Sequence, residues 1–146
     1  MSEEINEEKE VVHGFHPDTI IWTVEGQKKI SEITEPVKVY ARGDYGIDYL
    51  MIGPAYESGE SETLTFTLSN GSKITVSPET KLDCGFQGWV AAKYLEPREK
   101  IVIFTDDMLV ERSIKSIKKN EEPIKLWAVP GSSMIIGSGS GFCVKI

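Results

Sequence analysis

Few residues in this 146-residue chain have side chains suited to acid–base or nucleophilic chemistry. His13 and His16 are the only histidines, and imidazole is the side chain that titrates nearest to neutral pH. Both lie near the start of the chain, where a surface or turn role is the simpler interpretation. Because they flank Gly14, an auxiliary role in catalysis stays open.

The two cysteines, Cys84 and Cys143, are too few for a disulfide framework and lack the Cys-x-x-Cys spacing of zinc or redox sites. Their simplest role is that of small buried hydrophobic residues. A disulfide between them stays open if they meet in space and the protein leaves a reducing compartment. Cys143, close to the C-terminus, is also a candidate surrogate nucleophile.

Other polar clusters are explained by turns and solvated surface. Asp106–Asp107 and segment 43–46 have turn composition, since aspartate side chains bond their own backbone. Segment 137–141, Gly-Ser-Gly-Ser-Gly, lacks the Lys-Ser/Thr of a phosphate loop. It is either a natural turn, which we favour, or an engineered linker. A mixed-charge strand end and turn accounts for the basic cluster Lys115, Lys118 and Lys119.

The composition indicates one soluble globular domain. No apolar run approaches the roughly 20 residues of a membrane span, and the first ten residues lack the apolar region of a secretory signal. A formal net charge of -7 opposes binding to a phosphate backbone. We therefore expect a cytoplasmic or virion protein that binds neither nucleic acid nor membrane and holds no metal or cofactor.

Turn residues recur roughly every 8 to 12 positions, which is typical of an all-β domain. Residues 62–76 form the clearest hairpin, because Asn70-Gly71 supplies the positive φ values of a tight turn. At most one short helical turn is expected, at 89–95. Residues 1–10 are interpreted as an acidic flexible tail, and 11–146 as the β domain. Further strands are predicted at 20–24, 37–40, 49–52, 101–104, 108–117, 124–129, 133–136 and 142–145.

Four blocks of sequence, in this order, are similar to those of the Hedgehog/intein (Hint) family. The first runs from Gly14 through an apolar pair to Gly26 and the Ile30 to Ile33 step. The second, 74–80, resembles a hairpin followed by the family's Thr-x-x-His motif, and the third begins Gly88-Trp89-Val90. The fourth, 124–144, resembles the closing strands. The similarity covers about residues 11 to 146 and implies a horseshoe of curved strands.

The resemblance places the family's self-cleavage chemistry at positions where this chain has other residues. The first-residue nucleophile, a cysteine or serine, is replaced by Gly14, and the general-acid histidine by Thr80. Splicing members end in His-Asn, whereas this chain ends Lys145-Ile146. Neither terminal residue can cyclise. These four residues are therefore interpreted as former active-centre positions.

The preferred hypothesis is a non-catalytic module for protein–protein interaction or assembly, with a protein partner or a second copy of itself. A phage or mobile element is the expected context, because genes of the family that it resembles are common there. The competing hypothesis is a protein-splicing domain in an inactivated or engineered form, in which Gly14 replaces a cysteine. Function cannot be taken from fold alone, so the site must decide between them.

Overall fold

The computed structural model describes residues 12–131 and 133–145. The segment predicted as a tail lies outside these residues, and so does Ile146. The prediction of an all-β fold is confirmed. The strands are β1 (Ile20–Thr23), β2 (Gly26–Lys29), β3 (Val37–Arg42), β4 (Ile47–Ile52), β5 (Tyr56–Leu68), β6 (Lys73–Val76), β7 (Lys81–Asp83), β8 (Trp89–Ala91), β9 (Lys100–Thr105), β10 (Met108–Ala128), β11 (Ser133–Ile136) and β12 (Gly141–Lys145).

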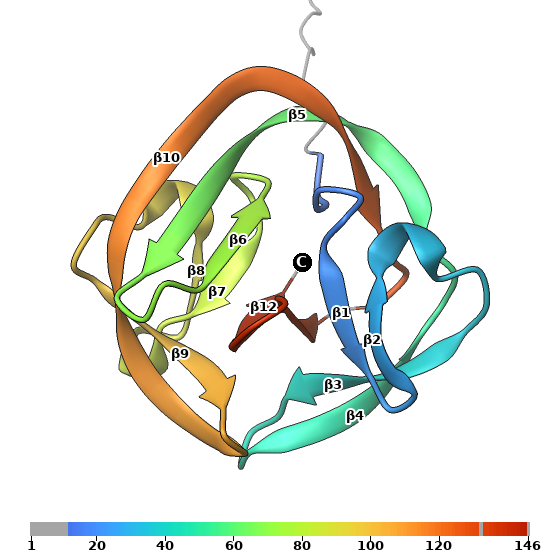
Figure 1. Cartoon of the computed structure of the whole chain (residues 1–146), viewed down its shortest axis with the longest axis horizontal. Helices are drawn as coiled ribbons and strands as arrows, with labels where there is room; N and C mark the ends of the chain where they lie inside the picture. Colours follow the sequence, from blue (N-terminus) through green and yellow to red (C-terminus); the bar gives the residue numbers. More distant parts are fainter. Residues whose placement is uncertain (1–11, 132, 146) are drawn as a thin grey trace, which may run out of the picture.

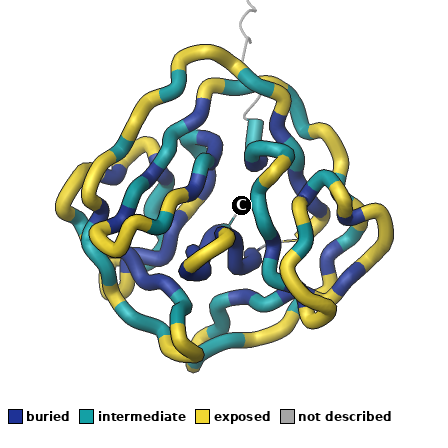
Figure 2. The backbone as a smooth tube through the Cα atoms, viewed as in Figure 1, coloured by how far each residue is buried: buried dark blue, intermediate teal, exposed yellow. Residues whose placement is uncertain are grey.

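One curved sheet connects these strands in the order β4-β3-β1-β11-β12-β9-β10-β5-β6, with β2 beside β1 and β7 between β12 and β8. The two longest strands, β5 and β10, pair with each other and arch around the outside of the molecule (Figure 1). Strand β12 lies near the centre. Buried residues concentrate in the strands around this centre, and exposed residues lie mainly on the outer turns (Figure 2).

Alternation of apolar and polar residues explains which faces are buried. In β3, Val37, Val39 and Ala41 are buried while Lys38 points to solvent, as expected for a strand with one covered face. The hairpin of β5 and β6 is confirmed, with Thr65 paired to Thr75. Its turn uses Gly71 at φ +91°, a conformation that glycine adopts without steric cost.

A single long strand, β10, covers the two strands predicted at 108–117 and 124–129. A shift in its register with β5 falls between Asn120 and Ile124 and contains Pro123, whose missing N–H is tolerated at such an irregularity. The basic cluster Lys115, Lys118 and Lys119 is exposed as expected. The prediction that it forms a strand end and turn is wrong, because it lies in the middle of β10.

The helical content differs in detail from the prediction. Segment 89–95 is helical only in its second half, since Trp89–Ala91 pairs with β7 as strand β8 and the 3-10 turn covers Ala92–Tyr94. Among the described residues, two more single 3-10 turns are present, Ile30–Glu32 and Gly85–Gln87. Such turns are too short to show a helical period in the sequence. None of the helices in the described ranges has the length and apolar character needed to cross a membrane.

Candidate functional site

Gly14 lies at the point where the chain enters the sheet. The Gly14 N–H points to Ser77 Oγ at 3.4 Å, and the Ser77 N–H donates to the Gly14 carbonyl at 3.2 Å. The next residue, Phe15, exchanges backbone hydrogen bonds of 2.8 and 2.9 Å with Trp127 of β10. The peptide group between residues 13 and 14 is therefore held between the end of β6 and the end of β10.

Thr80 reaches this peptide group through Ser77. The two hydroxyl oxygens lie 2.9 Å apart, and both residues are fully buried. Hydroxyl groups can hydrogen-bond to the Gly14 amide, but they do not exchange protons near neutral pH as imidazole does. The chain Gly14–Ser77–Thr80 can position the amide and supplies no general acid.

A side chain at position 14 has no space. A Cβ atom built on Gly14 would lie 2.6 Å from Ser58 Oγ, 2.8 Å from the Trp127 carbonyl oxygen and 3.0 Å from Leu126 Cβ. Gly14 also has a φ of +155°, a conformation that residues with side chains rarely adopt. Position 14 therefore accommodates glycine and no residue with a side chain.

The C-terminal strand ends in the same region. Lys145 pairs with Lys81, the residue after Thr80, and its ammonium group lies 5.5 Å from the centre of the Trp89 ring. The structure thus brings Gly14, Thr80 and Lys145 to one region, although they are far apart in the sequence. Ile146 lies outside the described residues.

The resemblance of this chain to known proteins lies in its structure. No protein-family model and no curated protein matches the chain. Several solved structures match this chain. A DnaB intein from Synechocystis sp. matches with a TM-score of 0.77 at 14% identity, covering 90% of this chain and 98% of its own.

Two further matches agree with the first. The TvoVMA intein gives a TM-score of 0.78 at 17% identity, covering 90% of this chain and 96% of its own. A bacterial intein-like domain from Clostridium thermocellum gives 0.72 at 17%, covering 92% and 99%. This chain has the Hint fold. The expected horseshoe is confirmed, and identities this low establish the fold without the activity.

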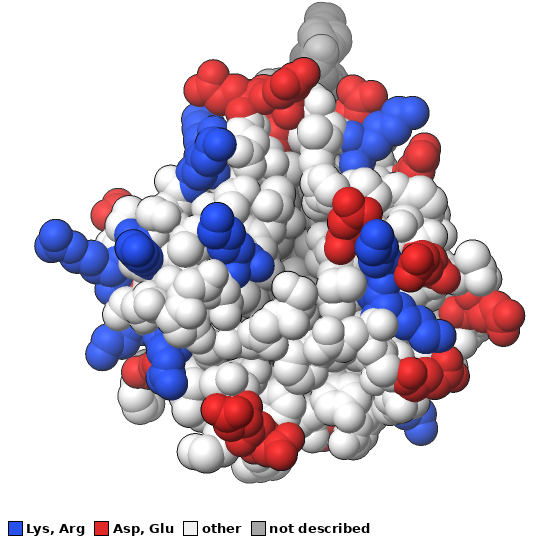
Figure 3. Space-filling model, in the orientation of Figure 1, with Lys and Arg blue, Asp and Glu red and all other residues white. Residues whose placement is uncertain are grey.

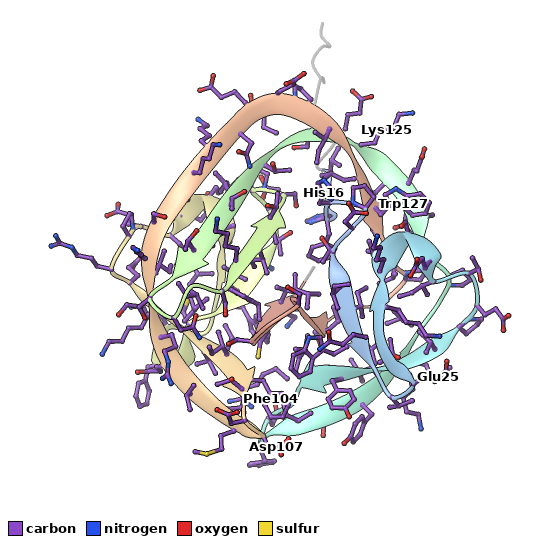
Figure 4. The ribbon with its side chains drawn as sticks, in the orientation of Figure 1. His16, Glu25, Phe104, Asp107, Lys125 and Trp127 are labelled. Carbon is purple, nitrogen blue, oxygen red and sulfur yellow. The ribbon has the colours of Figure 1, made fainter. Side chains whose placement is uncertain are left out.

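The two histidines of this Hint-fold chain occupy different environments. His16 Nδ1 accepts a hydrogen bond of 3.0 Å from the Asp18 N–H, so His16 stabilises a turn. It lies at the same end of the molecule as Trp127 (Figure 4). His13 lines a cavity beside Ser58, and its Nδ1 atom is buried without a hydrogen-bond partner among the described residues.

Both cysteines are free and buried. Burial, with a smaller contribution from the Asp83 carboxylate, raises the pKa of Cys84 to about 11 and that of Cys143 to about 12. Neither thiol forms the reactive thiolate near neutral pH. Val144 pairs with Leu82, so continuing this register places Cys143 opposite Asp83 and Cys84 one residue further, with its side chain on the other face of the sheet. This arrangement does not favour a disulfide.

The remaining polar segments are turns. Asp106 and Asp107 have φ values of 52° and 61° and join Thr105 to Met108 in a two-residue hairpin turn. Segment 137–141 is a packed hairpin turn: the Trp22 indole N–H donates to the Gly137 carbonyl at 2.7 Å, and Asn70 bonds Ser140. Over residues 12–131 and 133–145, no cluster of three or more His, Cys, Asp or Glu side chains could hold a metal.

Two residues of the region were missed by the sequence reasoning. Ser77 could have been found, because Ser77 and Thr80 have the spacing of the first and last residues of the family's Thr-x-x-His motif. Ser58 carries no comparable signal. Its position beside Gly14 depends on the pairing of β5 with β10, which only the tertiary structure shows.

Proposed function

We propose that this Hint-fold chain is a non-catalytic module that makes protein–protein contacts, as an assembly component of a phage or mobile element. The observation that carries the proposal is the lack of space for a side chain at position 14. Autoprocessing needs a side-chain nucleophile there, and Ser58 Oγ and the Trp127 carbonyl occupy the space that such a side chain would need.

The loss of chemistry extends beyond the nucleophile. Thr80 is buried and bonded to Ser77, where a proton donor would be needed to release the amide nitrogen. Meanwhile hydrogen bonds to Ser77 hold the Gly14 backbone in place. A Hint fold without a nucleophile at position 14 and without a proton donor at position 80 supports a role in binding rather than catalysis.

The second candidate is an intein in an inactivated or engineered form. It is favoured by the contact between Gly14 and Ser77, which keeps the amide in place. The tight fit around Gly14 argues against it, because a recently removed cysteine would leave space for its side chain. It also does not account for Thr80.

Restoration of the lost groups tests the choice between these candidates. The variant carries Gly14→Cys and Thr80→His, with a His-Asn terminus and a test peptide attached, and a second version adds Ser58→Gly to make room. We expect both to remain uncleaved when intact mass is followed with and without thiol. Circular dichroism must show that each variant is folded. Cleavage by either folded variant would establish the inactivated intein instead.

The expected partner is a protein or a second copy of this chain. The net charge of -7 argues against nucleic acid, and the proposed location is the cytoplasm or the virion. Light scattering and intact mass spectrometry of the protein, purified and recovered from its source, test this directly. A stable oligomer or a co-purifying particle is expected. A lone 16.3 kDa monomer in both preparations would contradict the assembly role.

A further inference from the structure

A groove lies between strand β6 and the start of β1. Its main cavity, of about 330 Å³, is lined by His16 and residues 18–20 on one side and by residues 73–75 of β6 on the other. A second cavity, of about 430 Å³, adjoins it, since Lys73 and Ser138 line both. The face shown in Figure 3 is hollowed near its centre, and charged side chains gather mainly around its rim. The two cavities together form one groove along an edge of β6.

The edge of β6 that faces this groove has no strand beside it. In the described ranges β6 is the last strand of the sheet order and pairs only with β5. The Leu68 N–H of β5 donates to the Ser72 carbonyl at 2.9 Å. Because successive residues of a strand direct their backbone groups to opposite sides, those of Lys73 and Thr75 point away from β5.

Three backbone groups on this edge are free. An isolated bridge between Phe15 and Val76 takes up the edge from the Thr75 carbonyl onward. The Lys73 N–H, the Lys73 carbonyl and the Thr75 N–H make no hydrogen bond to the described residues. Lys73 is exposed and Thr75 is half-buried, and both line the groove. A ligand that enters the groove can therefore reach this edge.

The free groups match the backbone of a second extended chain. An unpaired strand edge is a template for another strand, and many peptide-binding domains use it in this way. The groups include two donors and one acceptor. A carboxylate ion could accept from the N–H groups but could not donate to the Lys73 carbonyl, whereas a peptide does both. Ile20 and Ile74 also line the groove, where they can contact an aliphatic side chain.

The side chains of the groove favour an acidic residue beside Lys73. Lys73 forms no ion pair with the described residues, whereas the Asp18 carboxylate lies 3.7 Å from Lys29 Nζ. The His16 Nδ1 atom accepts from the Asp18 N–H, so neutral His16 carries its proton on Nε2 and is a further donor. Opposite charges that face each other across two strands stabilise the pairing.

We propose that the free edge of β6 binds an extended segment of a partner protein as an added strand, with an acidic residue beside Lys73 and an aliphatic residue beside Ile74. The segment donates to the Lys73 carbonyl and accepts from the N–H groups of Lys73 and Thr75. This inference rests on the proposed interaction function and names the surface that carries it.

A capped pentapeptide, acetyl-Thr-Val-Glu-Val-Thr-amide, is the probe, because it has one acidic residue between two aliphatic ones. It is titrated into the ¹⁵N-labelled full chain and followed by NMR. We expect saturable shifts confined to residues 18–20, 73–75 and 137–138. Hydrogen exchange of the Lys73 and Thr75 amides should slow in the complex, because both then donate hydrogen bonds. Shifts over the whole surface, or unchanged exchange of these amides, would overturn the proposal.

Methylation of the probe tests whether its backbone pairs with β6. One methylated peptide carries an N-methyl group on Glu and the other carries one on each Val, so that opposite edges of the extended peptide are blocked. We expect one of the two to lose at least tenfold in affinity and the other to bind as the parent does. The peptide that fails reports the direction of the added strand. If both bind as the parent does, or if sodium acetate alone produces the same shifts, the groove holds only a carboxylate and the proposal is wrong.

Charge reversal tests the role of the lysine. Lys73→Glu, at an exposed position, should weaken binding of the probe by about fivefold, because attraction across the two strands becomes repulsion. A probe with Lys in place of Glu should bind this variant better than it binds the wild type. Lys125→Glu is the matched control, since Lys125 is an exposed lysine of β10 on the outer arch (Figure 4), and should leave binding unchanged. Equal weakening by both variants would show that only net charge matters, against the proposal.

The failure of this inference can be separated from failure of the proposed function. If the native protein assembles, the probe does not bind and Lys73→Glu leaves the assembled mass unchanged in light scattering, the β6 edge is not the contact surface and the module role stands. If the probe binds and the protein nevertheless remains a lone monomer in every preparation, the edge is a binding site and the assembly role is wrong. If Lys73→Glu dissociates an oligomer of the purified protein, the inference is upheld and the added strand belongs to a second copy.

Discussion

Ser58 Oγ lies 2.6 Å from the point that a Cβ atom on Gly14 would occupy, so residues 14 and 58 fit together only while residue 14 is glycine. The Trp127 carbonyl closes the same space from β10 at 2.8 Å. An added side chain would push against the backbone of one long strand and a side chain of the other.

Gly14→Ala should therefore destabilise the protein. Overpacking together with a strained φ should lower the free energy of unfolding by about 2–4 kcal/mol in chemical denaturation. Gly26→Ala is the matched control, because Gly26 also has a positive φ, +112°, but no atom lies within 4 Å of its Cβ position. Its cost should be clearly smaller. Adding Ser58→Gly to Gly14→Ala should recover part of the loss, and equal losses at both glycines would show that steric closure is absent.

The hydroxyl pair of Ser77 and Thr80 should show energetic coupling. Ser77→Ala removes the partner of the buried Thr80 hydroxyl, and Thr80→Val removes the partner of Ser77. Each change alone should cost about 1–3 kcal/mol, because it leaves a buried hydroxyl short of a partner. The double variant should cost less than the sum, with a coupling of about 1 kcal/mol. Strict additivity in denaturant titrations would indicate that the two hydroxyls do not interact.

The ion pair of Arg42 with Asp83 ties β3 to β7. The Arg42 Nε lies 3.1 Å from Asp83 Oδ2, and the Asp83 side chain is only 10% exposed. Arg42→Met leaves this carboxylate nearly buried without its cation, and should lower the free energy of unfolding by about 2 kcal/mol or more. Lys93→Met breaks a more exposed pair with Glu79, and should cost clearly less than Arg42→Met does. Similar losses in the two variants would contradict the difference in burial.

The two cysteines should make stability depend on alkaline pH. Their folded-state pKa values, about 11 and about 12, lie above the value of 9.0 for an exposed thiol. The folded state therefore holds these protons more tightly, and this contribution is complete below pH 9 and is lost as the pH rises toward 11 and 12.

The measurement compares the wild type with Cys84→Ala/Cys143→Ala at pH 8 and pH 10.5. The stability of the wild type relative to the double variant should fall between these values. Iodoacetamide at pH 8 should label both thiols rapidly only after unfolding. Fast labelling of the native protein, or a constant stability difference, would show that the thiols are accessible.

The turn 137–141 should behave as part of the fold. A Cβ atom on Gly141 would lie 2.4 Å from Ile135 Cγ2, whereas one on Gly139 would meet only Ser72 Oγ at 3.6 Å. Gly141→Ala should therefore lower the melting temperature markedly, by overpacking of about 1–3 kcal/mol, and Gly139→Ala should hardly change it. Equal tolerance at both positions would indicate a flexible linker.

Local patterns were sufficient for most of the strands. The strand predicted at 37–40 is part of β3, and Asn70-Gly71 identified the hairpin of β5 and β6, because these signals act over a few residues. The strands β2, β7 and β8 were missed. They are only three or four residues long and obtain their hydrogen bonds from partners that the sequence does not name.

The sequence by itself determined the all-β class, the order of the Hint-like blocks and the absence of a nucleophilic side chain at Gly14. Tertiary structure alone decided that Ser77 joins Gly14 to Thr80, that Ser58 closes position 14 and that His13 faces a cavity. The physical reason is long-range pairing, of β5 with β10 and of Phe15 with Val76 and Trp127. It brings together residues that are far apart in the sequence, which no local pattern of polarity records.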